Sequence, residues 1–517
     1  MAWVQVASSP VRWQRPIGEN ERMIKWLGDR SHSMGREHWS VTAIGSFTLR
    51  SDAKDSSSGS VAPSTTALRR AWMLLRFQHP SIAATAGEHT IDYVVPDKAI
   101  LENWADETLH IVSDSGISAE DVVATLRPSP YAEGYFLPHT QQFVLHTAHW
   151  RTDGYGILHL LNAFFDALAS VLPETAADPA TALAWGEEHT RLAPAVEELL
   201  GIPETPTPAI RAAAAECLAT TALAAGSVGL PWRREAKQPG GTRGVRRTLA
   251  EPATKAVLAA CEARGLRLRA AVHASLAAAN FLAAERKAPP APVATVGDGA
   301  DAPSLAQPQQ QEQYYTSTMR FTLRPYIPSL APNSPRHAAG LYTGGYFARV
   351  SDAQTWQDHA AQYEALYAAG LSSDFLIARR QYAAEALERF QALAAATGAG
   401  AGAGKAPPPR SEIDISAVDD AEQLVAPARP VTSTHGSEPS TGGEGADGAN
   451  GHVLEVLDLS LGVECLAQET YLFLWTFRGR IEFHLVYNEA FYDAEYMAEM
   501  LRLVESVLLK ELHVDTM

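Results

Sequence analysis

The sequence predicts an α/β protein made of two units, with a reactive site at the end of one strand near the cleft between them. Strand-like and helix-like patterns alternate in both halves of the chain. Residues 226–244, rich in glycine, proline and arginine, separate the halves and predict a linker. A buried strand, a tight turn and an apolar helix follow one another over residues 143–168, with a histidine and an aspartate at the turn.

The first unit covers residues 1–225. Its strands are predicted from β-branched and aromatic residues, and its helices from apolar residues at helical spacing. The expected elements are a strand at residues 39–49, a helix at 65–77, strands at 91–96 and 143–149, and Ala-rich helices at 177–200 and 209–225. The first of these helices should end at His79-Pro80, because the residue before a proline disfavours helical backbone.

The second unit covers residues 245–517. Its expected elements are a strand at 245–249, helices at 251–264 and 268–287, a strand at 314–323, a hairpin of 470–477 with 481–488, and a helix at 493–509. Three compositionally biased segments, 288–312, 397–410 and 433–451, predict flexible loops. The Gly404-Lys405 pair is not a phosphate loop, because Ala399 and Ala406 replace the glycine and hydroxyl residue that such a loop needs.

Composition and charge limit the function classes. The chain has 517 residues, 46% hydrophobic and 20% charged, as in globular proteins with a large core. A formal net charge of -17 argues against nucleic acid or an anionic membrane as the main partner. The 3 cysteines are far apart and predict no disulfide framework and a reducing compartment. With no long apolar run and no apolar leader, we expect no membrane span and a cytoplasmic location.

The strand, turn and helix carry the spacing His149-x-x-x-Asp153-Gly154. A histidine at a strand end suits general-base catalysis, because its pKa lies near physiological pH. Asp153 would orient that histidine or brace the loop, and Gly154 would let the chain turn without a side chain in the way. The helix after the turn is predicted by apolar residues that recur from Ile157 to Leu168.

Three other roles fit the same residues. Asp153 could serve as the N-cap of the helix, alone or in addition. His149 could be a hydrogen-bonded core histidine. His146 and His149 could be taken for metal ligands, but histidines three apart on a strand face opposite sides and no cysteine or acidic residue stands at ligand spacing. We therefore expect no metal among the site residues.

The segment His149-Trp-Arg-Thr-Asp153-Gly154 resembles the His-x-x-x-Asp-Gly motif of the CoA-dependent acyltransferase superfamily. That group includes plant BAHD acyltransferases, chloramphenicol acetyltransferases and peptide-synthetase condensation domains. The early helix ending at His79-Pro80 and the late hairpin ending at Asn488 fit the same resemblance.

The opening of the chain is most similar to fungal trichothecene 15-O-acetyltransferases. The similar segments are Arg15-Pro-Ile-Gly, Ile24-Lys-Trp-Leu-Gly-Asp-Arg and His38-Trp. The resemblance spans most of the chain outside the three biased segments.

The resemblance implies two chloramphenicol-acetyltransferase-like lobes, each a mixed sheet with flanking helices, around a central tunnel. Acyl-CoA would enter from one side and an alcohol from the other. His149 would take the proton from the hydroxyl and later protonate the leaving thiolate, while Gly154 would keep the tunnel accessible. Asp153 would be structural and pair with an arginine of the second lobe, with Arg320 as the first choice and Arg324 as the second.

The resemblance further implies an O-acyltransferase that moves an acetyl or other short acyl group from acyl-CoA to a secondary-metabolite hydroxyl, such as that of a trichothecene-like sesquiterpenoid. Acyl-CoA would be a co-substrate, with no permanently bound cofactor, and we expect a monomer.

The plant-type Asp-Phe-Gly-Trp-Gly motif is absent from the sequence, and Ala148 stands where condensation domains have a first histidine. Two alternatives stay open: a condensation-like enzyme with a carrier-bound donor, and a non-catalytic binding protein on the same fold. The CoA-contacting residues are not identified.

Overall fold

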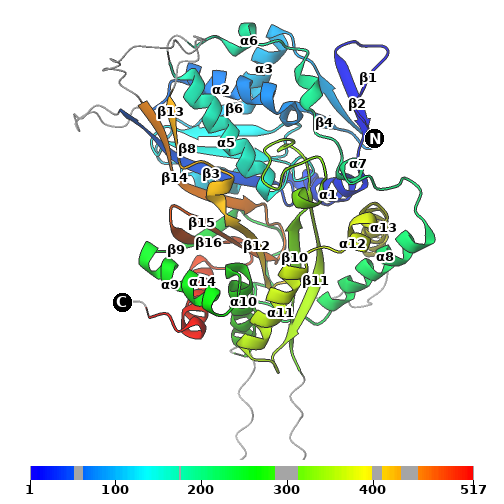
Figure 1. Ribbon diagram of the computed structural model, residues 1–517, viewed down its shortest axis with the longest axis vertical. Helices are drawn as coiled ribbons and strands as arrows, with labels where there is room; N and C mark the ends of the chain where they lie inside the picture. The colour runs from blue at the N-terminus through cyan, green and yellow to red at the C-terminus, as the bar shows by residue number, and fades with distance from the viewer. Residues whose placement is uncertain are drawn as a thin grey trace, which may run out of the picture.

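The computed structural model describes residues 2–51, 62–173, 176–285, 312–398, 410–431 and 452–515. Two larger sheets lie one above the other, each with helices packed on it (Figure 1). The upper sheet has six strands, antiparallel except for the β6–β7 pair. In spatial order they are β13 (Ala428–Val431), β14 (His452–Val463), β3 (Val41–Ser51), β8 (Gln142–Thr147), β7 (Glu133–Leu137) and β6 (Leu109–Ile111).

The lower sheet has four strands, and a two-stranded ribbon stands beside it. The sheet consists of β12 (Ile413–Asp420), β15 (Thr470–Phe477), β16 (Arg480–Asn488) and β9 (Thr242–Leu249), and the ribbon of β10 (Tyr314–Thr322) and β11 (Thr343–Ser351). A smaller four-stranded sheet near the start of the chain consists of β1 (Val4–Gln5), β2 (Arg12–Pro16), β5 (Thr90–Val94) and β4 (Thr85–Ala86).

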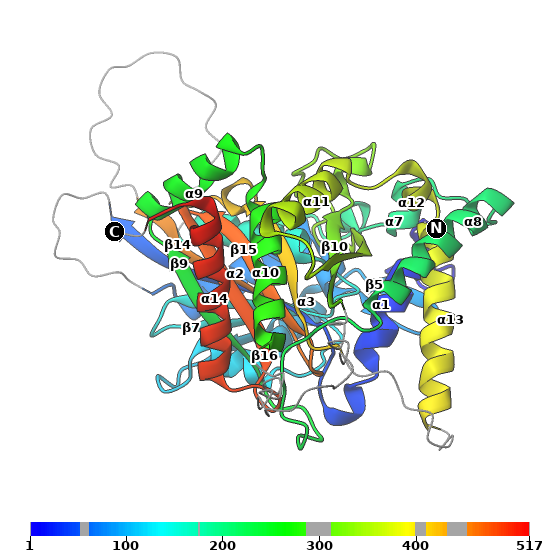
Figure 2. The ribbon, with the colours of Figure 1, turned by 90° about the horizontal axis from the view of Figure 1, so that it is seen from below.

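The helices fall into three groups. Those of the upper half are α2 (Thr65–Gln78), α3 (Lys98–Thr108), α4 (Ala119–Thr125), α5 (Gly154–Val171) and the short α6 (Pro179–Ala182). Those of the lower half are α9 (Glu251–Ala263), α10 (Leu268–Glu285), α11 (Trp356–Ala369) and α14 (Ala494–Leu512). A lateral group contains α1 (Glu19–Asp29), α7 (Val196–Leu199), α8 (Pro208–Ala219), α12 (Ser373–Ile377) and α13 (Arg379–Gly398). Seen from below, α14 and α10 run side by side across the lower sheet (Figure 2).

Two strands from late in the chain complete the upper sheet. β14 pairs with β3 along its whole length, from His452 opposite Ser51 to Val463 opposite Val41, and β13 pairs with β14. The division into a first lobe at 1–225, a linker at 226–244 and a second lobe at 245–517 stays a prediction. The segment that carries β13 and β14 belongs to the second lobe by sequence and to the upper sheet by hydrogen bonding.

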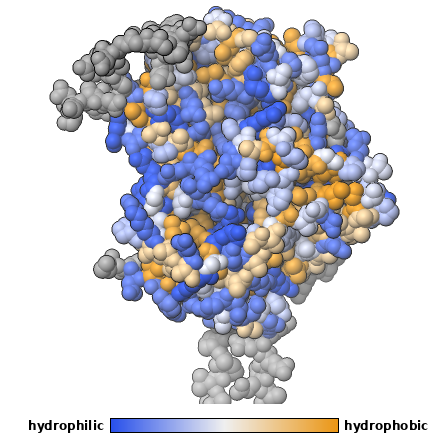
Figure 3. Space-filling view, viewed as in Figure 1, coloured by the Kyte–Doolittle hydropathy of each residue, from blue (hydrophilic) through white to orange (hydrophobic). Residues whose placement is uncertain are grey.

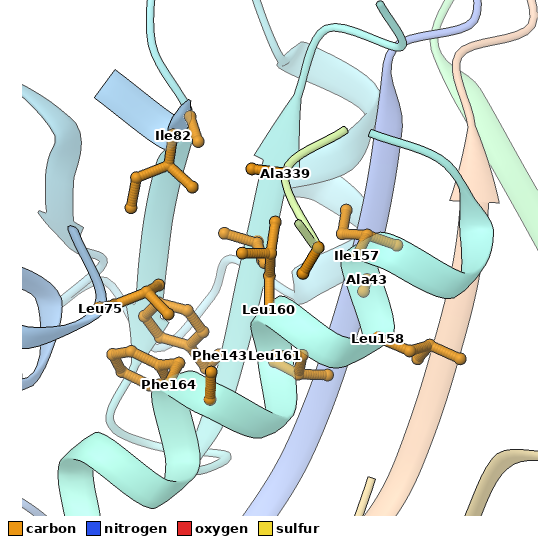
Figure 4. Packing of buried hydrophobic residues seen from close by; sticks show 14 of the residues in the cluster. Ala43, Leu75, Ile82, Phe143, Ile157, Leu158, Leu160, Leu161, Phe164 and Ala339 are labelled. Carbon is orange, nitrogen blue, oxygen red and sulfur yellow. The ribbon is translucent and has the colours of Figure 1, made fainter. Parts of the chain in front are cut away.

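The upper core forms where α5 packs on β3 and β8 (Figure 4). The rings of Phe143 and Phe164 stack with centroids 3.7 Å apart. At Gly45 of β3 a Cβ would lie 2.6 Å from the Phe165 ring, so glycine permits the close approach of helix and strand. Among the described residues only α5 is long and apolar enough to cross a membrane, and 72% of it is buried inside the protein. The apolar composition of α5 is therefore explained by its position in the core.

Most predicted elements are confirmed. The helix at 65–77 is α2 and ends at His79, and the hairpin at 470–488 is β15 and β16, turning at Arg478 and Gly479 with φ of 51° and 69°. The helix predicted at 177–200 is wrong, because only the single turns α6 and α7 and a 3-10 turn form there. Pro194 lacks the amide that a helix would use, and Gly186 takes a φ of 114°.

The three predicted flexible loops lie almost entirely outside the described residues, as does the Gly404-Lys405 pair. On the described surface, hydrophilic residues cover most of the face seen in Figure 1, and hydrophobic residues gather near α8, α12 and α13 (Figure 3).

Candidate active site

The predicted strand, turn and helix form, and the turn holds His149. β8 ends at Thr147 and α5 begins at Gly154, so His149 lies two residues beyond the strand. Its side chain is half-buried, and its Nδ1 lies 2.8 Å from the Thr152 carbonyl oxygen. A carbonyl oxygen only accepts hydrogen bonds, so Nδ1 carries the proton and donates it. Nε2 is then unprotonated, and it has no hydrogen-bond partner among the described residues.

The surroundings of His149 favour its neutral form. Burial lowers the pKa of His149 below its ordinary value, since a charged imidazolium would lose hydration. The Thr152 carbonyl and the Asp153 carboxylate raise the pKa by smaller amounts, and the Arg320 guanidinium lowers it further. A neutral imidazole with a free Nε2 is the form that a general base needs. Its Nε2, without a partner among the described residues, distinguishes this ring from a core histidine with both nitrogens hydrogen-bonded.

The turn itself is fixed from several directions. The Thr152 hydroxyl donates to the Ala338 carbonyl oxygen at 2.8 Å, which links the turn to a loop from the second half of the chain. The guanidinium of Arg151 is fully buried and donates to the Ala84 carbonyl at 2.9 Å and to the Thr147 hydroxyl. These bonds hold the carbonyl that orients His149.

Asp153 acts both as a helix cap and as one half of a buried ion pair. Its Oδ1 accepts from the Gly156 amide at 2.8 Å, which caps α5. Nη1 of Arg324 donates to both carboxylate oxygens at 2.7 and 2.9 Å. The Tyr342 amide donates to Oδ2 at 2.7 Å. The Arg324 side chain is 0% exposed and that of Asp153 is 4% exposed, so the pair is removed from solvent.

The prediction that Arg320 pairs with Asp153 is wrong, and the second choice, Arg324, is the partner. Arg320 instead donates to Asp414 Oδ2 at 2.9 Å and to the Ile415 carbonyl at 2.8 Å, both on β12. The two arginines lie four residues apart on one segment, and only the residue beyond the end of β10 reaches Asp153. Arg320 still acts on the site through its charge, since it lowers the pKa of His149.

The role of Gly154 in access to a tunnel stays a prediction, while the structural demand for glycine falls on Gly156. Gly154 is the first residue of α5 and is not among the described glycines with positive φ. A Cβ at Gly154 would meet nothing within 4 Å. A Cβ at Gly156 would lie 2.3 Å from the Ala338 carbonyl oxygen and 2.9 Å from Arg324 Nη2. Glycine at 156 therefore lets α5 approach the ion pair, while the open space beside Gly154 is compatible with its predicted role in access to a tunnel.

Among the described residues, His146 and His149 do not share a cluster of possible metal ligands. Nδ1 of His146 lies 3.8 Å from Glu133 Oε2 on β7, while His149 donates to a backbone carbonyl. Thr152, Tyr342 and Gly156 were missed as supporting residues. The Thr152 carbonyl and the Tyr342 amide are backbone groups, which leave no signal in the sequence, and the partner of the Thr152 hydroxyl lies far away in the chain. Gly156, the second glycine after Asp153, was visible in the sequence.

A small pocket, partly open to solvent, lies between the two larger sheets, and we call it the seam cavity. Its polar wall includes Ser460 and His484, whose Nδ1 donates to the Leu461 carbonyl at 2.7 Å. Its aliphatic wall consists of Ile44, Val123, Leu461, Val463 and Val486. Burial lowers the pKa of His484 to about 4, so the ring is neutral at physiological pH and its Nε2 can accept a hydrogen bond.

The seam cavity begins close to the catalytic turn, although His149 is not one of its lining residues. Val463 pairs with Val41, and Val41 pairs with Thr147, the last residue of β8. Neighbouring strands lie about 4.8 Å apart, so this end of the cavity is two strand spacings from the base of the turn. A mostly apolar cavity with a few polar groups is typical of small-molecule sites.

Comparisons with known proteins agree with this geometry. The chain is 42% identical to "Acetyltransferase pigO" of Monascus ruber, over 99% of both chains. It is 26% identical to "O-acetyltransferase pigM" of Monascus ruber, over 93% of this chain and 82% of the relative. No protein-family model matches the chain.

The solved structures support the fold. Trichothecene 15-O-acetyltransferase from Fusarium sporotrichioides superposes with a TM-score of 0.70 at 15% identity, over 98% of this chain and 97% of that one. The first condensation domain of the calcium-dependent antibiotic synthetase superposes with a TM-score of 0.56 at 14% identity, over 97% of both chains. The two-lobe fold of the CoA-dependent acyltransferases is therefore confirmed.

Proposed function

The chain belongs to the family of fungal acetyltransferases that includes acetyltransferase pigO of Monascus ruber, and from this premise we propose that it transfers an acetyl group from acetyl-CoA to a hydroxyl group of a secondary metabolite. The observation that carries the proposal is the state of His149. Its Nδ1 is tied to the Thr152 carbonyl and its Nε2 is left as a free base.

In the proposed mechanism, Nε2 of His149 removes the proton of the acceptor hydroxyl as its oxygen attacks the thioester carbonyl carbon. The tetrahedral intermediate collapses with cleavage of the carbon–sulfur bond, and the imidazolium returns the proton to the CoA thiolate. The products are the acetyl ester and the free thiol. General-base catalysis of this kind contributes about 10²- to 10⁴-fold.

Asp153 does not touch the reacting atoms in this account and is a positioning residue. Its carboxylate holds the start of α5 and the backbone of the catalytic turn against Arg324. Positioning matters because the base must stand at hydrogen-bond distance from the hydroxyl. Loss of Asp153 would therefore displace His149 without removing it.

The seam cavity is our candidate for binding the apolar body of the acceptor. Its aliphatic wall would contact one side of a terpenoid or polyketide skeleton, and Nε2 of His484 would accept a hydrogen bond from a hydroxyl that does not react. The Fusarium protein is a trichothecene 15-O-acetyltransferase, so a trichothecene-like sesquiterpenoid alcohol is the first acceptor to test.

The test is thiol release from acetyl-CoA by the purified protein with a panel of terpenoid and polyketide alcohols. Alcohol-dependent release, with the acetyl ester identified by mass spectrometry, is the expected result. The matched comparison presents the same alcohols with acetyl groups on a phosphopantetheinylated carrier protein. Turnover with that donor and none with free acetyl-CoA would overturn the proposal in favour of a condensation-like enzyme.

A further inference from the structure

One histidine and two carboxylates meet at the end of α1, away from the residues of the catalytic turn. Nε2 of His32 lies 3.5 Å from Asp29 Oδ1 and 4.0 Å from Glu37 Oε1. Ligand atoms of the three residues all lie within 4.8 Å of one another. Asp29 is the last residue of α1, His32 begins a 3-10 turn, and Glu37 precedes β3, so three consecutive segments converge on one point.

Glu37 is buried without a hydrogen-bond donor. Its side chain is 5% exposed, and its carboxylate accepts no hydrogen bond from any residue that the structure describes. Among the described residues, the cationic group that comes within 4.0 Å of this carboxylate is the His32 ring. A nearly buried carboxylate without a hydrogen-bond donor favours a charged partner or a cation beside it. This carboxylate points toward the other two ligand atoms.

The backbone holds Glu37 in this position. The chain reverses at Gly35, whose φ is 68°, and the His38 amide donates to the Gly28 carbonyl oxygen at 3.4 Å. Gly28 also leaves room for the carboxylate, since a Cβ there would lie 3.3 Å from Glu37 Oε1. The main chain therefore holds Glu37 beside the other two residues, and the exposed His32 ring has room to adjust.

We infer that Asp29, His32 and Glu37 form a binding site for one divalent transition-metal cation of the zinc class, with water completing the coordination. An imidazole nitrogen together with carboxylate oxygens suits such a cation. Ligand atoms around tetrahedral zinc lie about 3.3 Å apart, given metal–ligand distances of about 2.0–2.1 Å. The two distances from His32, 3.5 and 4.0 Å, and the limit of 4.8 Å over all three ligand atoms mean that the site must contract when it binds the cation.

Two neighbouring features affect the binding of a cation: another cationic group that pairs with Asp29, and the access of solvent to His32. Lys25 forms an ion pair with Asp29 Oδ2, which leaves Oδ1 for the cation. His32 is 42% exposed, so solvent and metal can reach the site. The ordinary alternative is a protonated His32 that pairs with both carboxylates and binds no metal, and the two cases differ in measurable metal content.

The experiment uses the full chain stripped of metal with EDTA and titrated with Zn²⁺ in equilibrium dialysis and calorimetry. We expect one saturable Zn²⁺ per chain and weak binding of Mg²⁺. His32→Ala and Glu37→Gln each remove one ligand, and each should weaken that site at least about 100-fold, since even outer-shell partners cost about 10- to 100-fold. A Zn²⁺-dependent rise in melting temperature should disappear in both variants.

The matched control is His89→Ala. His89 is an exposed histidine 3.6 Å from Glu88, and it is not part of a three-ligand cluster among the described residues. Its loss should leave Zn²⁺ binding unchanged. The proposal is overturned if the wild-type chain binds no Zn²⁺ saturably, or if His32→Ala and Glu37→Gln bind it as the wild type does. Neither result depends on acetyl transfer.

Discussion

Replacing Asp153 with alanine should destabilise the fold more than the loss of any ordinary helix cap. The change leaves the Arg324 guanidinium, 0% exposed, without its counter-charge. Removing one partner of a buried ion pair costs about 3–5 kcal/mol. The lost α5 cap costs about 1 kcal/mol, and the Tyr342 amide also loses its acceptor. Because these terms share one carboxylate they do not add fully, and we expect a loss of about 4 kcal/mol.

The assay is urea unfolding of the wild type, Asp153→Ala and Asp97→Ala. Asp97 caps α3 through a bond of 2.8 Å to the Ile100 amide at an exposed position, so Asp97→Ala removes a cap alone and should cost about 1 kcal/mol. The double variant Asp153→Leu with Arg324→Met replaces the ion pair by apolar groups and should recover much of the loss. The reasoning is refuted if Asp153→Ala is no less stable than Asp97→Ala.

Three further predictions concern the same site. Gly156→Ala should lower the melting temperature and the rate of acetyl transfer, because its Cβ would clash with the Ala338 carbonyl. Gly154→Ala places its Cβ in open space and should keep the melting temperature at or above that of the wild type. Equal losses in both variants would contradict the conclusion that the structural demand for glycine falls on residue 156. The value of kcat/KM should fall at acid pH with a midpoint below 6.5, because the lowered pKa keeps His149 unprotonated to lower pH. A midpoint above 6.5 would be inconsistent with the burial of His149. His484→Phe should raise the KM for the alcohol about tenfold or more and leave the KM for acetyl-CoA within about twofold of the wild type. A raised KM for acetyl-CoA with an unchanged KM for the alcohol would instead place acetyl-CoA in the seam cavity.

The local chemistry of the site could be predicted from the sequence because it depends on neighbours in the chain. The strand, the turn and the helix around His149 are encoded by apolar periodicity and by a capping aspartate, and all three form as expected. The helix predicted at 177–200 fails for a comparably local reason, since Gly186 and Pro194 interrupt an Ala-rich segment.

The long-range partners could not be predicted in the same way. Arg320 and Arg324 have the same chemistry, and the choice between them depends on how the end of β10 docks against α5. The seam cavity needs strands from both halves of the chain to meet, and the pairing of β14 with β3 leaves no trace in local sequence patterns. The same holds for Gly156, whose constraint comes from a loop almost two hundred residues away.

Nε2 of His149 is the proposed base for acetyl transfer. The most direct test measures the release of free thiol from acetyl-CoA by His149→Ala, with an alcohol that the wild type acetylates. Turnover should fall by about 10²- to 10⁴-fold while the urea midpoint stays that of the wild type. His139→Ala is the matched control, because the His139 side chain is exposed and bonds just the Ser113 carbonyl among the described residues, and this variant should keep wild-type turnover. Turnover of His149→Ala within about threefold of the wild type would contradict the account.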